Sequence, residues 1–249
     1  MKKLFDKDEI WFAVLWIVIY VIGFSNADAL SVSVGVPKLL TVFVGLILSL
    51  LLYSFIKSNQ LLEYFGLCAV KGNYRNYLYF VPLVLLTSVN LWNGITCNYP
   101  ITETVLHIAS MCFVGFLEEV IFRGLLFKGM CRMNATAAII VSSLAFGMGH
   151  IINLLLGEPI FETLLQLVYA SAIGFCYTAI FYVSGSILPC VISHASFNSL
   201  SAFAVQPADE ANLIITFIMT VSSIGYGAWL LCNDKQRKTA DKNSGRDVC

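Results

Sequence analysis

Hydrophobic residues fall in long runs along the chain, separated by short segments rich in Gly, Pro, Asn, Ser and charged residues. A helix needs about 20 apolar residues to cross a bilayer, and the runs have about this length. The pattern therefore predicts an all-α, polytopic membrane helix bundle of about eight transmembrane helices in one domain, residues 1–232. The polar residues 233–249 are expected to form a disordered tail. The predicted helices cover residues 9–25, 37–56, 76–93, 104–127, 135–156, 162–183, 187–204 and 211–232.

The composition favours a membrane protein and excludes some other classes. Of the 249 residues, 58% are hydrophobic and 12% are charged, whereas a soluble domain has about 45–50% apolar and about 25% charged residues. No basic stripe with interleaved aromatic residues is present, so nothing indicates binding of nucleic acid. The eight cysteines form no CxxC pair, and we expect no disulfides among them. Membrane lipid is therefore the first expected partner.

Lys and Arg are distributed unevenly between the two sides of the predicted bundle. Short loops rich in positive charge stay in the cytoplasm, so this distribution predicts that both termini are cytoplasmic. The other side carries only Lys38. The cytoplasmic side is assigned 13 of the 15 basic residues, namely Lys2, Lys3, Lys7, Lys57, Lys71, Arg75, Lys128, Arg132, Lys235, Arg237, Lys238, Lys242 and Arg246.

Three ionisable residues, Glu118, Glu119 and Arg123, lie within an otherwise apolar run. A charge inside the bilayer costs about 2.5–3.5 kcal/mol even on a lenient scale, so such residues mark a functional site by default. Glu119 and Arg123 have the spacing and order of an ion pair on one helix face. Glu118 lies about 100° further round the helix. We expect Glu119 to orient and Glu118 to transfer protons, although an ion-paired packing knot is the structural alternative.

Two later helices carry histidines in suitable positions. Phe146 and His150 are four residues apart, as are His194 and Asn198, so each pair projects from one helix face. Taken alone, each histidine could serve only hydrogen bonding between helices. Together with the carboxylates, these groups can hold a divalent metal such as Zn²⁺ or orient a water directly, while a glutamate takes the proton of that water. Both routes lead to hydrolysis.

The depth of these residues in the membrane gives a rough check. Counted from the cytoplasmic ends at a rise of 1.5 Å per residue, Glu118 lies about 15 Å deep and His194 about 10 Å deep. His150 lies more than about 20 Å deep on the same count. Its helix must tilt, or bend at Gly147 and Gly149, to bring it level with the other two.

The segments Glu118–Arg123, Phe146–His150 and His194–Asn198 resemble, in this order, the three motifs of the CPBP intramembrane proteases. This family includes the type II CAAX prenyl endopeptidases and the bacterial Abi proteins. The resemblance covers a catalytic core of about residues 103–203. It implies cleavage of a peptide bond within or at the membrane, with Glu118 as the base that activates water.

The resemblance also implies roles for the remaining motif residues. His150, His194 and Asn198 would shape the water or metal site and the oxyanion, while Glu119 and Arg123 would support it. Phe122 and Phe146 are the candidate substrate-binding residues. A divalent metal (Zn²⁺) would use His150, His194 and Glu118, and we favour a metal-free glutamic protease over a metal-dependent one.

The expected substrate is a lipidated, CAAX-like or hydrophobic peptide or protein that reaches the active site from the cytoplasmic side. The expected location is the plasma membrane of a bacterium. A proton-coupled transporter, with Glu118, Glu119, His150 and His194 as a relay, is an alternative. Such carriers usually consist of two related halves, whereas here the buried ionisable groups lie only in the later helices. A non-catalytic bacteriocin-immunity protein of the same family is a third possibility.

Overall fold

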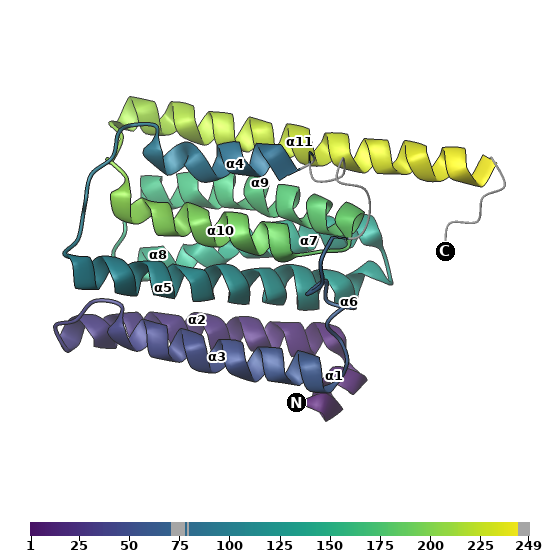
Figure 1. The fold of residues 1–249 in the computed structure, drawn as a ribbon, viewed down its shortest axis with the longest axis horizontal. Helices are drawn as coiled ribbons and strands as arrows, with labels where there is room; N and C mark the ends of the chain where they lie inside the picture. The colour runs from purple at the N-terminus through teal and green to yellow at the C-terminus, as the bar shows by residue number, and fades with distance from the viewer. Residues whose placement is uncertain (71–77, 79, 244–249) are drawn as a thin grey trace.

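The computed structural model describes residues 1–70, 78 and 80–243, and its secondary structure is helical. The helices run back and forth along one direction (Figure 1). The elements are α1 (Lys2–Lys7), α2 (Glu9–Ser33), α3 (Leu39–Ser58), α4 (Val81–Ser88), η2 (Val89–Leu91), α5 (Ile101–Glu118), η3 (Glu119–Phe127), α6 (Lys128–Cys131), α7 (Ala135–Met148), η4 (Gly149–Ile151), α8 (Ile152–Leu155), α9 (Ile160–Ser184), α10 (Leu188–Leu200), η5 (Ser201–Phe203) and α11 (Asp209–Asn243).

Within the described residues, six helical segments are long and apolar enough to cross a membrane, and they coincide with six of the predicted spans. The other two predicted spans, 76–93 and 187–204, coincide with shorter helices. α4 continues through η2 as an apolar helix that ends at Leu91, and α10 continues through η5 to Phe203. Both run alongside the long helices (Figure 1). The all-α membrane bundle is thus confirmed, while the count of eight spans stays a prediction.

The end of the last helix differs from its predicted position. α11 continues to Asn243, well past residue 232, where the span was expected to end. Lys, Gln and Arg in this region are good helix formers, which is consistent with the extension. The predicted disordered tail, 233–249, therefore overlaps this helix, and its last residues, 244–249, lie outside the described residues.

The two ends of the bundle differ in charge. One end, which we call the basic end, holds the N-terminus and the ends of α3, α6 and α11 (Figure 1). The other, which we call the acidic end, holds the links that follow α2, α4, α8 and α10. Lys38 is its one basic residue among the described ones, beside the acidic residues Asp28, Glu103, Glu158, Glu162, Asp209 and Glu210.

The outer helices turn large hydrophobic side chains away from the bundle. Trp11 and Val32 of α2 are 66% and 69% exposed, and Phe217 of α11 is 68% exposed. Water would oppose this arrangement, whereas lipid favours it, because lipid tails are as apolar as these side chains. The chain is therefore an integral membrane protein.

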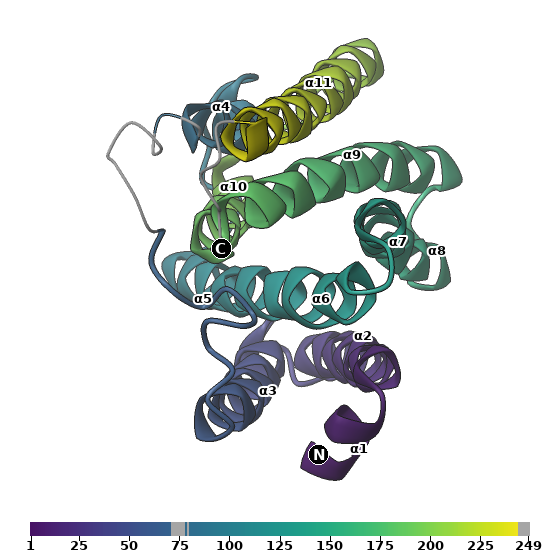
Figure 2. The ribbon, with the colours of Figure 1, turned by 90° about the vertical axis from the view of Figure 1, so that its right-hand side faces the viewer.

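The continuous helix formed by α5, η3 and α6 runs through the middle of the bundle. α2 and α3 pack on one side of it, and α7, α9 and α10 lie on the other (Figure 2). η3 is a π-helix, and all nine of its residues are buried. π-helical segments are rare and occur frequently at functional sites. The apolar run with charged residues, expected as one helix, is thus the core of the fold.

Candidate functional site

Glu118 and Glu119 lie at the junction between α5 and η3, near the middle of the central helix. The Glu119 side chain is fully buried, whereas that of Glu118 is 11% exposed. Because neighbouring helical residues point in directions about 100° apart, the two carboxylates face different surroundings. The site therefore has two sides, which we call the dry side, around Glu119, and the cavity side, around Glu118.

On the dry side, one carboxylate oxygen joins two partners. Oε1 of Glu119 lies 3.1 Å from Nη1 of Arg123, which is also fully buried, and 2.9 Å from Nδ1 of His194. The ion pair expected from the four-residue spacing is present. An ionised carboxylate can only accept hydrogen bonds, so Nδ1 of His194 carries the proton and Nε2 points the other way.

Aromatic rings complete the surroundings of Arg123. The guanidinium carbon lies 4.1 Å from the centre of the Phe146 ring and 5.6 Å from that of Tyr177, which is the geometry of cation–π attraction. Gly174 leaves room for the guanidinium, since a Cβ there would lie 3.1 Å from Nη2. Nε and Nη2 of Arg123 and Oε2 of Glu119 have no hydrogen-bond partner within the described chain. Aromatic faces therefore replace part of the polar shell of the arginine.

A close approach of two helices positions His194. A Cβ on Gly115 of α5 would lie 2.7 Å from the backbone nitrogen of Ala195 on α10, so the two backbones are almost in contact. His194 precedes Ala195 in the chain and is 6% exposed. Glycine at position 115 thus allows α10 to come close enough for the imidazole to reach both carboxylates.

On the cavity side, Glu118 has a partner that the sequence did not suggest. The Tyr20 hydroxyl of α2 donates a hydrogen bond of 2.5 Å to Oε1 of Glu118. Oε2 lies 3.6 Å from Nε2 of His194, a distance too long for a hydrogen bond. Tyr20 is one of 11 tyrosines and has no neighbouring motif, so no sequence signal distinguishes it. One oxygen of Glu118 is therefore fixed, and the other faces open space.

That space is a cavity of about 170 Å³ between α2, the central helix and the α7–α8 segment. Ser25 and Asn153 add polar groups to its wall. The predicted site residues Glu118, Phe122, Phe146 and His150 line the cavity, together with Tyr20, Val21, Phe24, Asp28, Gly149, Ile152 and Leu156.

A change in helix type at the end of α7 places His150 beside the other residues of the cavity. α7 ends at Met148, and Gly149–Ile151 forms a short 3-10 turn before α8. The Phe146 ring lies between the two histidines, with its centre 5.8 Å from the His150 ring and 5.5 Å from the His194 ring. Phe122 packs edge-to-face on Phe146 at 5.5 Å. The structure thus groups Glu118, His150 and His194 around Phe146.

Four predicted site residues are not part of the cavity lining, namely Glu119, Arg123, His194 and Asn198. The first three connect to it through contacts with one another, with Glu118 and with Phe146, whereas Asn198 lies elsewhere on α10. Its backbone carbonyl lies 3.3 Å from Nε2 of His107 and accepts a hydrogen bond of 2.7 Å from the Ser201 hydroxyl. The His107 ring stacks on Tyr99 with a ring separation of 5.5 Å. The role predicted for the Asn198 side chain therefore stays a prediction.

The donor set gives little support to a metal centre. Among the described residues, no three His, Cys, Asp or Glu side chains are grouped closely enough to hold a metal ion. A role of Glu118, His150 and His194 as metal ligands stays a prediction. We derive no step of the chemistry through a metal.

In comparisons with known proteins, one family model matches the middle of the chain. Residues 100–200 match the family model described as type II CAAX prenyl endopeptidase Rce1-like. The matched segment runs from the residue before α5 to the end of α10, so it contains all three motifs and the whole central helix. No curated protein and no solved structure matches the chain.

Proposed function

We propose that this chain, whose residues 100–200 match the type II CAAX prenyl endopeptidase Rce1-like family model, is an intramembrane endopeptidase in which Glu118 activates the attacking water. One observation carries the proposal. Tyr20 holds one carboxylate oxygen of Glu118, and the other faces both the cavity and His194. A general base must be within hydrogen-bonding reach of the proton that it removes, and a water in this cavity would meet that condition.

The proposed reaction needs only groups that face the cavity. Glu118 takes a proton from the water as the water oxygen attacks the carbonyl carbon of the scissile peptide bond. The protonated Glu118 then gives this proton to the leaving nitrogen as the C–N bond breaks, which yields a free amine and a carboxylic acid. Tyr20 keeps the carboxyl group in place through both steps by its hydrogen bond to Oε1.

The two histidines are suited to stabilise the charge that forms on the carbonyl oxygen. His194 is held at Nδ1 by Glu119, so Nε2 is directed towards Glu118 and a bound substrate. His150 lines the opposite wall of the cavity. Donors fixed before the reaction stabilise developing charge without reorganisation, and the loss of one such donor typically costs about 10²–10³ in rate.

The cavity walls favour a hydrophobic peptide, in keeping with a CAAX-like or other apolar substrate. Phe24, Phe122, Phe146, Ile152 and Leu156 provide most of the lining. The apolar part of a substrate would pack on these side chains, and the peptide bond would lie between Glu118 and the histidines. Phe122 and Phe146 therefore keep the substrate-binding role that we assign to them.

The proposal predicts loss of peptide cleavage in two variants. Purified Glu118→Gln protein, which cannot accept a proton, should lose at least about 10²-fold in cleavage of an internally quenched hydrophobic peptide. His194→Ala should lose a similar factor. Glu103→Gln is the matched control, because Glu103 lies in the first turn of the same helix and outside the cavity.

Two results would contradict this function. Full cleavage by both Glu118→Gln and His194→Ala would show that neither the proposed base nor its histidine partner takes part in the reaction. Glu118-dependent transport in proteoliposomes without any hydrolysis would favour a proton-coupled transporter instead. Incubation with a strong chelator tests separately whether the mechanism is metal-free. If it is, cleavage should be unchanged after the chelator is removed by dialysis.

A further inference from the structure

We infer that the chain binds a small organic cation, a primary ammonium group attached to a short apolar body, in a second cavity at the acidic end of the bundle. This cavity has a volume of about 240 Å³ and lies between η2, α9, α10 and α11. It shares no lining residue with the cavity beside Glu118, so the inference goes beyond the cleavage reaction and does not depend on it. Three observations carry it: a carboxylate without a basic partner, two amides of fixed orientation, and a lining that becomes apolar with depth.

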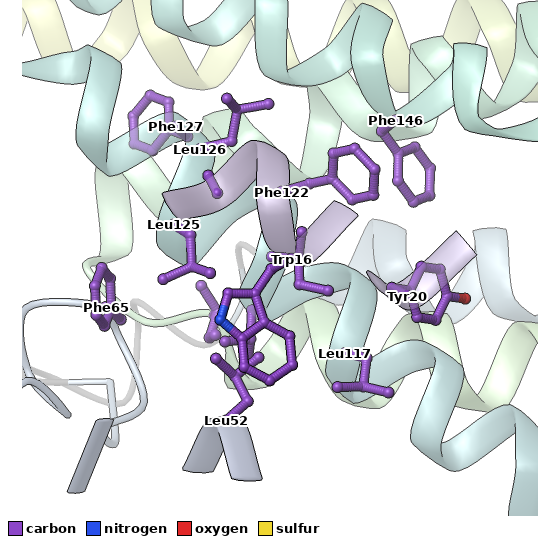
Figure 3. Close-up of a cluster of buried hydrophobic side chains, with 14 of the residues drawn as sticks. Trp16, Tyr20, Leu52, Phe65, Leu117, Phe122, Leu125, Leu126, Phe127 and Phe146 are labelled. Carbon is purple, nitrogen blue, oxygen red and sulfur yellow. The ribbon is translucent and has the colours of Figure 1, made fainter. Parts of the chain in front are cut away.

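The walls of the second cavity differ from the hydrophobic core around the central helix. In that core, Trp16, Leu117 and Phe122 lie among other apolar side chains (Figure 3). The second cavity combines apolar side chains with polar groups from separate parts of the chain, namely Asn90, Asn93, Glu162, Gln166, Gln206 and Asn212. Apolar walls with a few convergent polar groups are the general make-up of a ligand site.

Glu162 supplies the charge of this cavity. It lies in the first turn of α9, and its Oε2 accepts a hydrogen bond of 2.8 Å from the Asn212 side chain of α11. No Lys, Arg or His side chain pairs with it among the residues that the structure describes. The N-terminus of α9 offsets only about half of a unit charge. The cavity therefore keeps a negative charge that a bound cation would balance.

The hydrogen bonds of two amides determine which of their atoms remain for a ligand. Asn212 donates through Nδ2 to the Glu162 carboxylate, and Asn90 donates through Nδ2 to the backbone carbonyl of Phe197 at 2.6 Å. Carboxylate and carbonyl oxygens only accept hydrogen bonds, so neither amide can be turned round. Within the described part of the chain, no donor bonds to the two Oδ1 atoms or to Oε1 of Glu162. A primary ammonium group, with three N–H donors and no acceptor, is complementary to these oxygens.

The lining becomes apolar with depth. Glu162 and Asn212 lie near the starts of α9 and α11, at the acidic end of the bundle (Figure 1). Tyr169 and Met219 lie about two turns further along the same two helices, and Met219 is 3% exposed. An ammonium group near the helix starts and a short hydrocarbon part further in would both meet matching walls. A single ion would leave most of the volume empty, since one water molecule takes up about 30 Å³ in the liquid.

Two kinds of molecule carry this chemistry, namely a free organic amine and the headgroup of an aminolipid such as phosphatidylethanolamine. Both offer a primary ammonium group. The lipid also brings a phosphate, and the one basic side chain at the acidic end among the described residues, Lys38, is already paired with Asp28 at 2.6 Å. The ammonium group is therefore the part of either molecule that the cavity recognises.

Thermal unfolding of the full-length protein in detergent micelles measures binding of n-butylammonium chloride. A ligand that binds only the folded state raises the midpoint of unfolding as its site fills. n-Butanol has the same chain length without the charge, and sodium chloride controls for ionic strength. Glu162→Gln removes the charge of the cavity but can still accept the hydrogen bond from Asn212. The controls are Glu210→Gln, at an exposed position of the acidic end outside the cavity, and Glu118→Gln, in the other cavity.

We expect n-butylammonium to raise the midpoint of the unaltered protein, of Glu210→Gln and of Glu118→Gln to the same degree. Glu162→Gln should need at least about tenfold more of the compound for an equal rise, because hydrogen bonds to charged groups are the stronger ones. n-Butanol and sodium chloride should cause no such rise in any of these proteins.

Nanodiscs separate the two sources of the ammonium group. The headgroup of phosphatidylcholine has no N–H donor, so n-butylammonium should raise the midpoint of the unaltered protein in discs of this lipid. If the natural ligand is a lipid headgroup, discs of phosphatidylethanolamine should abolish this response, because the site is already filled. If it is a free amine, the response should be equal in both kinds of disc.

Three outcomes would overturn the inference. Equal responses of Glu162→Gln and the unaltered protein would show that the cation does not bind at this carboxylate. A response to n-butanol as large as that to n-butylammonium would show that the cavity recognises only the hydrocarbon part. No response of the unaltered protein, in micelles and in phosphatidylcholine discs alike, would show that the cavity does not take an ammonium group. Peptide cleavage enters none of these measurements, so they stand apart from the test of the proposed function.

Discussion

The cavity side and the dry side of the central helix begin at adjacent residues, yet they differ in every property that matters for chemistry. Glu119 is fully buried and shares one oxygen between Arg123 and His194. Glu118 has a single tyrosine as a hydrogen-bond partner and an oxygen that faces open space. Identical side chains thus acquire different surroundings from the direction in which the helix points them. In the proposed mechanism, Glu119 on the dry side fixes geometry and Glu118 on the cavity side exchanges a proton.

Removal of Arg123 should have the largest effect on stability, because it leaves Glu119 charged and buried. Loss of one member of a buried ion pair typically costs about 3–5 kcal/mol, so Arg123→Met should lower the free energy of unfolding by about that amount. Denaturant titration in mixed micelles measures it. Arg132→Met is the control, since the Arg132 side chain is 68% exposed and its pairing with Glu9 should contribute little. Equal stability of the two variants would mean that the dry side is not an ion-paired core.

Gly115→Ala tests whether the contact between α5 and α10 sets the position of His194. The added methyl would lie 2.7 Å from the Ala195 nitrogen, and overpacking of this kind typically costs about 1–3 kcal/mol. The cleavage rate of Gly115→Ala should fall further than its loss of folding free energy alone explains, because His194 moves away from both carboxylates. Gly124→Ala is the control, because a Cβ there would make only an ordinary contact of 3.5 Å with Phe65.

Tyr20→Phe should act on the cavity side alone. A hydrogen bond to a charged group is worth about 1.5–3 kcal/mol, so the loss of this hydroxyl should slow cleavage about 10- to 100-fold while the free energy of unfolding changes much less. The KM of the quenched peptide should stay nearly constant, because Tyr20 acts through Glu118. Tyr53→Phe, at a 40% exposed tyrosine of α3, should change neither quantity. A rise in KM without a fall in kcat would instead assign Tyr20 to substrate binding.

Ser142→Ala should have the smallest effect. The Ser142 hydroxyl donates a hydrogen bond of 2.8 Å to the Phe122 carbonyl within η3, and its loss should cost about 1 kcal/mol. Thermal unfolding in micelles measures the change. The neighbouring Ser143 bonds a carbonyl of its own helix, so Ser143→Ala should be nearly neutral. Equal effects of the two substitutions would show that η3 does not depend on support from α7.

The features that could be predicted are those that depend on local spacing. The pairing of Glu119 with Arg123 follows from their spacing of four residues on one helix, and six spans follow from runs of apolar residues. Tyr20 could not be found in this way, because its link to Glu118 joins residues 98 positions apart and depends on how α2 packs on the central helix. The depth of His150 was misleading for a related reason. It was counted along a straight α-helix, whereas α7 ends at Met148 and a 3-10 turn carries His150.

The π-helical segment makes the central helix sensitive to the number of its residues as well as to their identity. In a π-helix each N–H reaches back five residues, and in an α-helix four, so η3 contains a register change that ordinary helix lacks. Deletion of one residue from it would change this hydrogen-bond register and rotate the side chains beyond the deletion relative to the two glutamates. The fully buried face of η3 leaves no room for such a rotation. Mutational change in this segment should therefore be confined to exchange of side chains, while gain or loss of residues is left to the links at the ends of the bundle.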